Sequence, residues 1–154
     1  MGMTPMVKIV VQTDGGEWHG MTYETLWGSP INDMNFRIEN APLYAYGISY
    51  HDIARCSRLD DGLYRFNFAV VKGGHSNYRL LLRKGKNPSD FLSRWDRLQR
   101  LGCVYESSKD PEDVFAIDVP PHVDVYAVFD VLDQGEKDGI WHLDEGNFEH
   151  AART

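Results

Sequence analysis

The stretch KGGHSNYRLLL, residues 72–82, decides how the chain divides. Gly73 and Gly74 give the backbone the freedom of a tight turn, and 78–83 has the composition of a β-strand. A β-rich run, 64–71, precedes the two glycines, and an amphipathic helical pattern follows the second run. The stretch therefore predicts a corner at which one unit of the fold ends and another begins.

The residues before this corner predict a small antiparallel β domain with a barrel-like shape, residues 1–76. Turn sequences separate its β-rich runs, and the runs lie at 7–12, 18–26, 35–39, 53–57 and 64–71. The turns include Asp14-Gly15-Gly16, Gly28-Ser29-Pro30 and Asp60-Asp61-Gly62. The aromatic segment 43–50 suits either an irregular strand or a packed loop.

The residues after the corner predict a ferredoxin-like βαββαβ domain, residues 77–150, so the expected fold class is α+β. Asn87 and Pro88 begin a helix that ends at Gly102, and Asp124 caps a second helix. Gly135 and Gly139 are expected to bracket the end of the second helix. The remaining strands are predicted at 104–105, 114–119 and 140–143, and 151–154 is expected to be a frayed tail.

Composition favours a cytoplasmic protein. The chain has 154 residues, is 42% hydrophobic and has no apolar run long enough to span a bilayer. Its first residues lack the pattern of a signal peptide. Cys56 and Cys103 lie far apart and fit neither a disulfide nor a zinc framework, so we expect no metal and no cofactor.

The net charge of −7 is distributed unevenly. Residues 55–100 hold eleven Lys and Arg against four Asp, whereas 104–154 hold thirteen acidic and three basic residues. Such asymmetry can steer a charged partner, and the alternative is ordinary solvated faces. Phe91 and Trp95 fall on the apolar face of the first helix, away from its arginines, which argues against nucleic-acid binding.

The acidic segment 124–149 is the first candidate site. Acidic side chains around an aromatic anchor could dock onto a basic protein cleft, with a solvated helix face as the alternative. The candidate partner-binding residues are Asp130, Asp133, Glu136, Asp138, Trp141, Asp144 and Glu145.

The second candidate is a pocket between the two halves. Its candidate residues are Tyr46, His51, His75, Ser76 and Arg79. A base and a nucleophile need mutual hydrogen-bond reach, yet neighbouring residues of a strand point to opposite faces. We therefore expect His75 and Ser76 to brace the corner, with a catalytic pair as the alternative.

Several segments together resemble a bacterial family catalogued as a domain of unknown function. They are AYGISYHD at 45–52, GHS at 74–76 and LGC at 101–103, and the resemblance extends over most of the chain after about residue 24. It implies no catalytic residues. It does imply that small proteins of this kind occur as immunity partners of bacterial toxins.

These observations together predict an immunity or antitoxin protein. It would occlude the basic cleft of a cognate toxin, of the kind that acts on nucleic acid or a nucleotide, and would catalyse nothing itself. The alternative is a small enzyme or ligand-binding protein with a pocket at His75 and Ser76.

Overall fold

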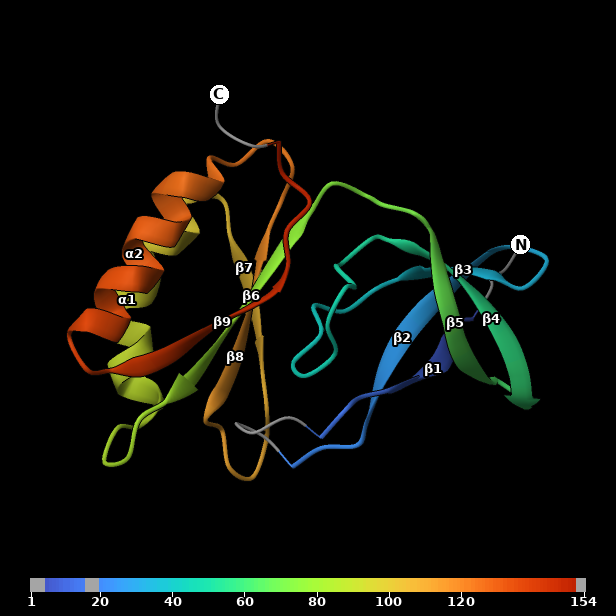
Figure 1. Ribbon diagram of the computed structural model, residues 1–154, viewed down its shortest axis with the longest axis horizontal. Coiled ribbons are helices and arrows are strands. Elements are labelled where there is room, and N and C mark those ends of the chain that lie inside the picture. The colour runs from blue at the N-terminus through green and yellow to red at the C-terminus, as the bar shows by residue number, and fades with distance from the viewer. Residues whose placement is uncertain (1–4, 16–19, 152–154) are drawn as a thin grey trace.

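A five-stranded barrel and a four-stranded sheet with two helices make up the α+β fold of the protein (Figure 1). The computed structural model describes residues 5–15 and 20–151. The barrel strands are β1 (Val7–Gln12), β2 (Tyr23–Asn32), β3 (Asn35–Ile38), β4 (Ile53–Asp60) and β5 (Leu63–Val71). The second unit contains β6 (Ser76–Leu82), α1 (Pro88–Leu101), β7 (Val104–Ser107), β8 (Val114–Val119), α2 (Val125–Lys137) and β9 (Trp141–Asn147).

The barrel closes through a parallel pair, which corrects the expectation of a wholly antiparallel domain. Residues 8–10 of β1 pair with residues 63–65 of β5 in parallel, whereas the other four pairings are antiparallel. The reason is the odd number of strands. When five strands alternate in direction, the first and the fifth run the same way, so closure must pair them in parallel.

The second strand of the barrel is longer than predicted and begins later. It passes through Gly28 and Pro30 to Asn32, although Gly28-Ser29-Pro30 was expected to end it. A register shift after Pro30 accommodates the proline, and a Cβ on Gly28 would lie 2.4 Å from Ile9 Cδ1 inside the barrel. The predicted beginning at residue 18 and the end of the predicted turn at residue 16 lie outside the described residues.

The second sheet has the strand order β7-β8-β6-β9, and each neighbouring pair is antiparallel. Both helices cover the face of this sheet that points away from the barrel (Figure 1). The predicted capping residues are confirmed, since the Asn87 side chain accepts the Ser89 amide and Asp124 accepts the amides of Tyr126 and Ala127. Gly102 ends α1 in the left-handed conformation.

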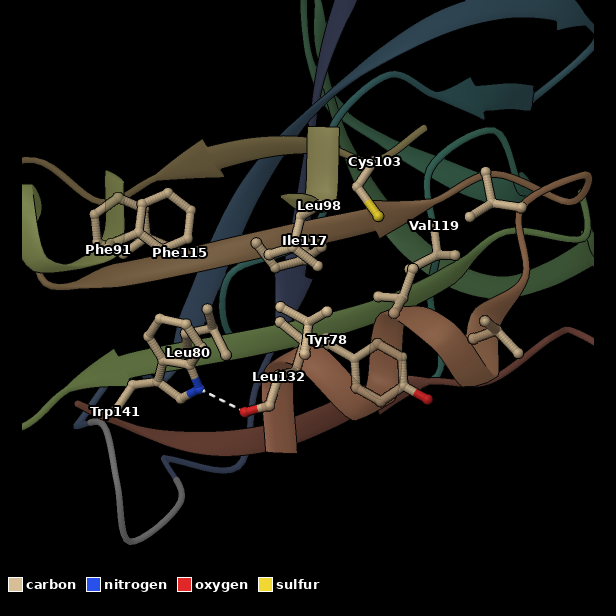
Figure 2. Packing of buried hydrophobic residues seen from close by; sticks show 14 of the residues in the cluster. Tyr78, Leu80, Phe91, Leu98, Cys103, Phe115, Ile117, Val119, Leu132 and Trp141 are labelled. Atoms are coloured by element: carbon tan, nitrogen blue, oxygen red, sulfur yellow. Dashed lines mark hydrogen bonds between the residues drawn. The ribbon is translucent and has the colours of Figure 1, made fainter. Parts of the chain in front are cut away.

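Aromatic and branched side chains fill the space between the helices and the sheet (Figure 2). Phe91 of α1 stacks on Phe115 of β8 with ring centroids 4.0 Å apart. Trp141 is fully buried, and its indole Nε1 donates to the carbonyl of Leu132 in α2 at 2.8 Å. Packing of the helices on this face leaves the opposite face of the sheet for contact with the barrel.

That opposite face is polar. Side chains alternate along a strand, so Tyr78 and Leu80 belong to the helix-side core while Arg79 points toward the barrel. By the same alternation Asp118 of β8 lies opposite Ile117 and Val119, which pack against the helices. The fold thereby places ionisable groups in the seam between the sheet and the barrel.

Candidate functional site

Residues 39–52, here called the seam loop, connect β3 to β4 and lie between the barrel and the second sheet (Figure 1). Glu24 of β2 accepts hydrogen bonds from the three backbone amides of residues 43–45 at 2.6–3.0 Å. Asp52 accepts the amides of Ser49 and Gly73, both at 2.9 Å. The segment 43–50 is therefore a packed loop whose backbone bonds carboxylates, one of the two forms expected from its sequence.

Arg79, predicted to border a pocket, is a fully buried clamp between the two units. Its guanidinium donates to the Asp144 carboxylate at 2.9 and 3.1 Å and to the carbonyl of Ala45 at 2.5 Å. The Tyr46 ring covers it at 4.5 Å, and the Tyr46 hydroxyl donates to Asp144 at 2.9 Å. These contacts place Tyr46 and Arg79 together in a cluster that fixes the seam loop to β6 and β9.

Ser76, which follows His75, was also predicted to line the pocket. Its side chain forms hydrogen bonds with the segment that follows β9. Its hydroxyl lies 2.6 Å from Nδ1 of His150 and accepts the amide of Glu149 at 2.9 Å. Ser76 and His75 thus contact different partners, as expected for adjacent residues of an extended chain. The Ser76 hydroxyl therefore joins β6 to the segment after β9, and its partners are His150 and the Glu149 amide and not His75.

The corner itself depends on two carboxylates. Asp52 accepts the Gly73 amide, and Glu149 accepts the Gly74 amide at 2.8 Å. Burial, together with a hydrogen bond that the protonated Glu149 carboxyl donates to Asp52, raises the pKa of Glu149 to about 7. A Cβ on Gly73 would lie 2.8 Å from the carbonyl oxygen of His51, so only glycine lets the corner pass the seam loop this closely.

His75 and His51 each bond a carboxylate and lie next to one another. His75 Nδ1 is 2.9 Å from Asp118 Oδ1, and His51 Nε2 is 3.1 Å from Glu39 Oε1. Their ring centroids are 5.6 Å apart, and the Tyr50 ring stacks on His51 at 3.8 Å. His51 has a φ of 68°, an unusual value for a residue with a side chain. Two predicted pocket residues are therefore brought together, from loops far apart in sequence.

A cavity of about 250 Å³ lies beside these two pairs, between the seam loop and the strands β7 and β8. Both carboxylates that bond the histidines face it, Glu39 from the barrel side and Asp118 from the sheet. The residues that line this seam cavity are Glu39, Ala41, Tyr50, Val104, Tyr105, Glu106 and Asp118. Its volume suits a small molecule.

The surroundings of the two carboxylates shift their pKa values in opposite directions. Burial raises the pKa of Asp118 to about 6, although the charge and hydrogen bond of His75 oppose the rise. Burial would also raise the pKa of Glu39, but hydrogen bonds from Ser29 and Arg37 outweigh it and hold that pKa below its ordinary value. Titratable groups whose pKa values are driven apart across one cavity are typical of an acid and a base.

The sequence interpretation missed Glu39, Tyr50, Glu106 and Asp118 as site residues. A usable signal existed only for Asp118, because it is the one charged residue in the buried strand VFAIDV, residues 114–119. Glu39 and Glu106 lie at the ends of strands, where a glutamate is typical of a solvent-exposed surface. Only the fold brings them to one cavity.

The candidate partner-binding residues lie in a different part of the molecule, and the prediction that Trp141 is a surface anchor is wrong. Trp141 is a core residue with no exposed surface, so it cannot serve as a docking anchor. Several of the others have partners within the protein, and the pairs are Asp133 with Lys137, Asp138 with Arg94, Asp144 with Arg79, and Glu136 with the Leu143 amide. Asp130 and Glu145 remain exposed.

A hollow of about 280 Å³ lies near the exposed acidic residues, between α2 and β9. It is mostly apolar and includes Phe129 and Phe148, which are 40% and 36% exposed. The lining residues are Tyr78, Val125, Tyr126, Phe129, Glu145 and Phe148. We call this feature the α2–β9 hollow.

Neither a metal-binding cluster nor a membrane-spanning helix is found within residues 5–15 and 20–151. No group of three or more His, Cys, Asp and Glu side chains in this part of the chain has an arrangement that could hold a metal ion. None of its helices is both long and apolar enough to cross a membrane.

Comparison with known proteins supports the fold and leaves the chemistry open. The model of a family described as "Domain of unknown function (DUF4265)" matches residues 24–143. No protein among the curated ones matches the chain. A crystal structure of a hypothetical protein from Neisseria gonorrhoeae superimposes with a TM-score of 0.76 over 97% of this chain and 100% of the other, at 19% identity. At that identity the likeness concerns the fold alone.

Proposed function

This chain belongs to the DUF4265 family of unknown function, and we propose that it binds a small ligand in the seam cavity and transfers a proton to it from Asp118. The observation that carries the proposal is the pair of carboxylates across the cavity. Asp118 has a pKa of about 6, and the pKa of Glu39 is lowered, so Asp118 is the group that holds a proton in mildly acidic solution.

Two further features support the assignment. His75 bonds both oxygens of Asp118 through Nδ1, at 2.9 and 3.1 Å, and so acts as a positioning residue. His51 bonds one oxygen of Glu39 through Nε2 from a left-handed backbone conformation, and unfavourable conformations of this kind cluster at functional sites. Asp118 would serve as general acid, while ionised Glu39 would serve as base or stabilise positive charge.

Replacing Asp118 with asparagine tests this role. Asparagine retains the shape and can still bond His75, but it has no acidic proton, so we expect turnover to fall about a hundredfold. The measurement is the consumption of compounds from a bacterial metabolite extract by the purified protein, followed by mass spectrometry. Activity should also decline as pH rises above about 6, because Asp118 then loses the proton that it must donate.

The matched control is Asp61→Asn, at an exposed position of the β4–β5 turn. It should consume the same compounds at the wild-type rate. If Asp118→Asn, shown to be folded by its circular dichroism, consumed them as fast as the wild type, the proton-transfer role would be refuted.

We propose toxin neutralisation as a second candidate function, and the α2–β9 hollow is the observation that favours it. A basic and apolar segment of a cognate toxin would place an apolar side chain in the hollow and a cation on Glu145. We further propose that the βαββαβ unit is ferredoxin-like, with its strand order β7-β8-β6-β9 as support. Two buried cysteines without a disulfide support a reducing, cytoplasmic location.

The neutralisation role predicts a stoichiometric partner encoded by a neighbouring gene. The protein should co-purify with that partner and abolish its toxicity, and Glu145→Lys should weaken the complex at least tenfold through like-charge repulsion. Glu112→Lys is the control, because Glu112 lies on the turn between β7 and β8. Recovery of the protein free of such a partner, with no toxin gene beside its own, would reject this second function.

A further inference from the structure

The chemistry of the seam cavity restricts the ligands that it can hold. Three of its seven lining residues are carboxylic acids, and none of those seven is Lys, Arg or His. The rest of the wall consists of Ala41, Val104 and the two phenol side chains Tyr50 and Tyr105. A negatively charged ligand would meet like charge here without a cation facing it.

Glu106 is the carboxylate whose charge is left uncompensated. It accepts hydrogen bonds from the Asn40 side chain at 2.7 Å and from the Ala41 amide, and both donors are neutral. Glu39, in contrast, has Arg37 at 3.0 Å, and Asp118 has His75. The carboxylate of Glu106 forms no ion pair with any residue in the described part of the chain. A half-buried anion of this kind favours a cation brought by a ligand.

The aromatic rings of the cavity also favour a positively charged ligand. The face of a tyrosine ring is electron-rich and attracts ammonium groups. Tyr50 is held by its stack on His51, and Tyr105 is held by edge contacts with Phe91 and Trp95, so both rings are fixed before any ligand arrives. A preformed wall lowers the ordering cost of binding.

We infer that the seam cavity binds small amines in their ammonium form, with an apolar or aromatic body against the two tyrosines. The ammonium group would contact Glu106 and the tyrosine faces. An ammonium nitrogen has no lone pair, so the proton of Asp118 would go to a different, basic atom of the ligand. This inference rests on the proposed ligand site in the seam cavity and names its substrate class. A primary amine on a ring the size of benzene matches a cavity of about 250 Å³.

Three compounds of one shape and different charge test the inference. Benzylamine, benzyl alcohol and benzoate are titrated into the full-length protein, and binding is followed by calorimetry and by the NMR signals of the tyrosine rings. We expect saturable binding of benzylamine, at least tenfold weaker binding of benzyl alcohol, and no binding of benzoate.

Substitutions at Val104 separate charge from shape. Val104 lines the cavity on β7 and is 58% exposed, so a longer side chain fits there without disturbing the core. Val104→Lys places a competing ammonium group at the entrance and should weaken benzylamine at least tenfold. Val104→Met has similar length and no charge, so it should weaken benzylamine far less than Val104→Lys does.

The outcomes distinguish this inference from the proposed function beneath it. Equal binding of benzylamine and benzyl alcohol, or equal effects of Val104→Lys and Val104→Met, would overturn the amine class while the cavity remains a ligand site. Binding of benzoate in preference to benzylamine would also overturn the amine class and leave the cavity as a ligand site. Absence of binding by all three compounds would overturn the amine class, whereas the proposed function depends on the separate Asp118→Asn measurement.

Discussion

Replacing Arg79 with methionine is expected to lower the free energy of unfolding by about 3–5 kcal/mol. The guanidinium is fully buried and donates to the Asp144 carboxylate and to the carbonyl of Ala45. Methionine fills much of the same volume but donates nothing, so the Asp144 carboxylate, which is 28% exposed, loses the cation beside it and the buried carbonyl of Ala45 loses a donor. Urea unfolding followed by circular dichroism measures the change.

The matched control is Arg83→Met, placed directly after β6, where the side chain is exposed. It should change the unfolding free energy by less than about 0.5 kcal/mol. Arg79→Lys should also destabilise, because one ammonium group cannot reproduce a planar fork with several donors. Adding Asp144→Leu to Arg79→Met should recover part of the loss, since the unpaired charge is then removed. A loss below 1 kcal/mol in Arg79→Met would contradict the clamp.

Arg79 also illustrates how far the sequence predicts this molecule. Alternating and amphipathic patterns located most elements, including the caps at Asn87 and Asp124, because those patterns are local. Arg79 belongs to an apolar strand in a basic stretch of the chain, and its role depends on the seam loop and on β9. Sequence spacing holds no information on contacts that join residues 45, 79 and 144.

The same limit applies to the candidate site. His51 and His75 were chosen for their chemistry and do lie together, 5.6 Å apart. The carboxylates that they bond come from β8 and from the end of β3, and the position of Glu39 at the end of β3 is not distinctive in sequence. A charged residue within a strand of six buried residues is the exception, so Asp118 is the member of the site that burial patterns could have found.

Gly135 shows what packing adds to a prediction from sequence. Gly135 and Gly139 were expected to bracket the end of the second helix, and α2 does end between them, at Lys137. Gly135 itself lies within α2 and is buried, with the Trp141 indole where a Cβ would lie. A glycine inside a helix is unfavourable by itself, so its presence indicates that another group needs the space. Trp141 was expected on the surface and is that group.

Gly135→Ala is therefore expected to destabilise the protein by about 3 kcal/mol, although alanine is the better helix former by about 1 kcal/mol. The added Cβ would lie 2.0 Å from Cζ2 and 2.3 Å from Cε2 of Trp141. The indole cannot move aside, because it has no exposed surface and its Nε1 bonds the Leu132 carbonyl at 2.8 Å (Figure 2). Thermal and urea unfolding would measure the loss.

Two further variants separate crowding from helix propensity. Asp130→Ala, at an exposed position of the same helix, should change the unfolding free energy by less than about 0.5 kcal/mol. Trp141→Phe removes part of the indole that the new methyl group would meet, so the double variant Gly135→Ala with Trp141→Phe should be less destabilised than the two single effects added together. Strict additivity would show that the methyl group and the indole do not compete for space, because two groups that occupy one volume must couple.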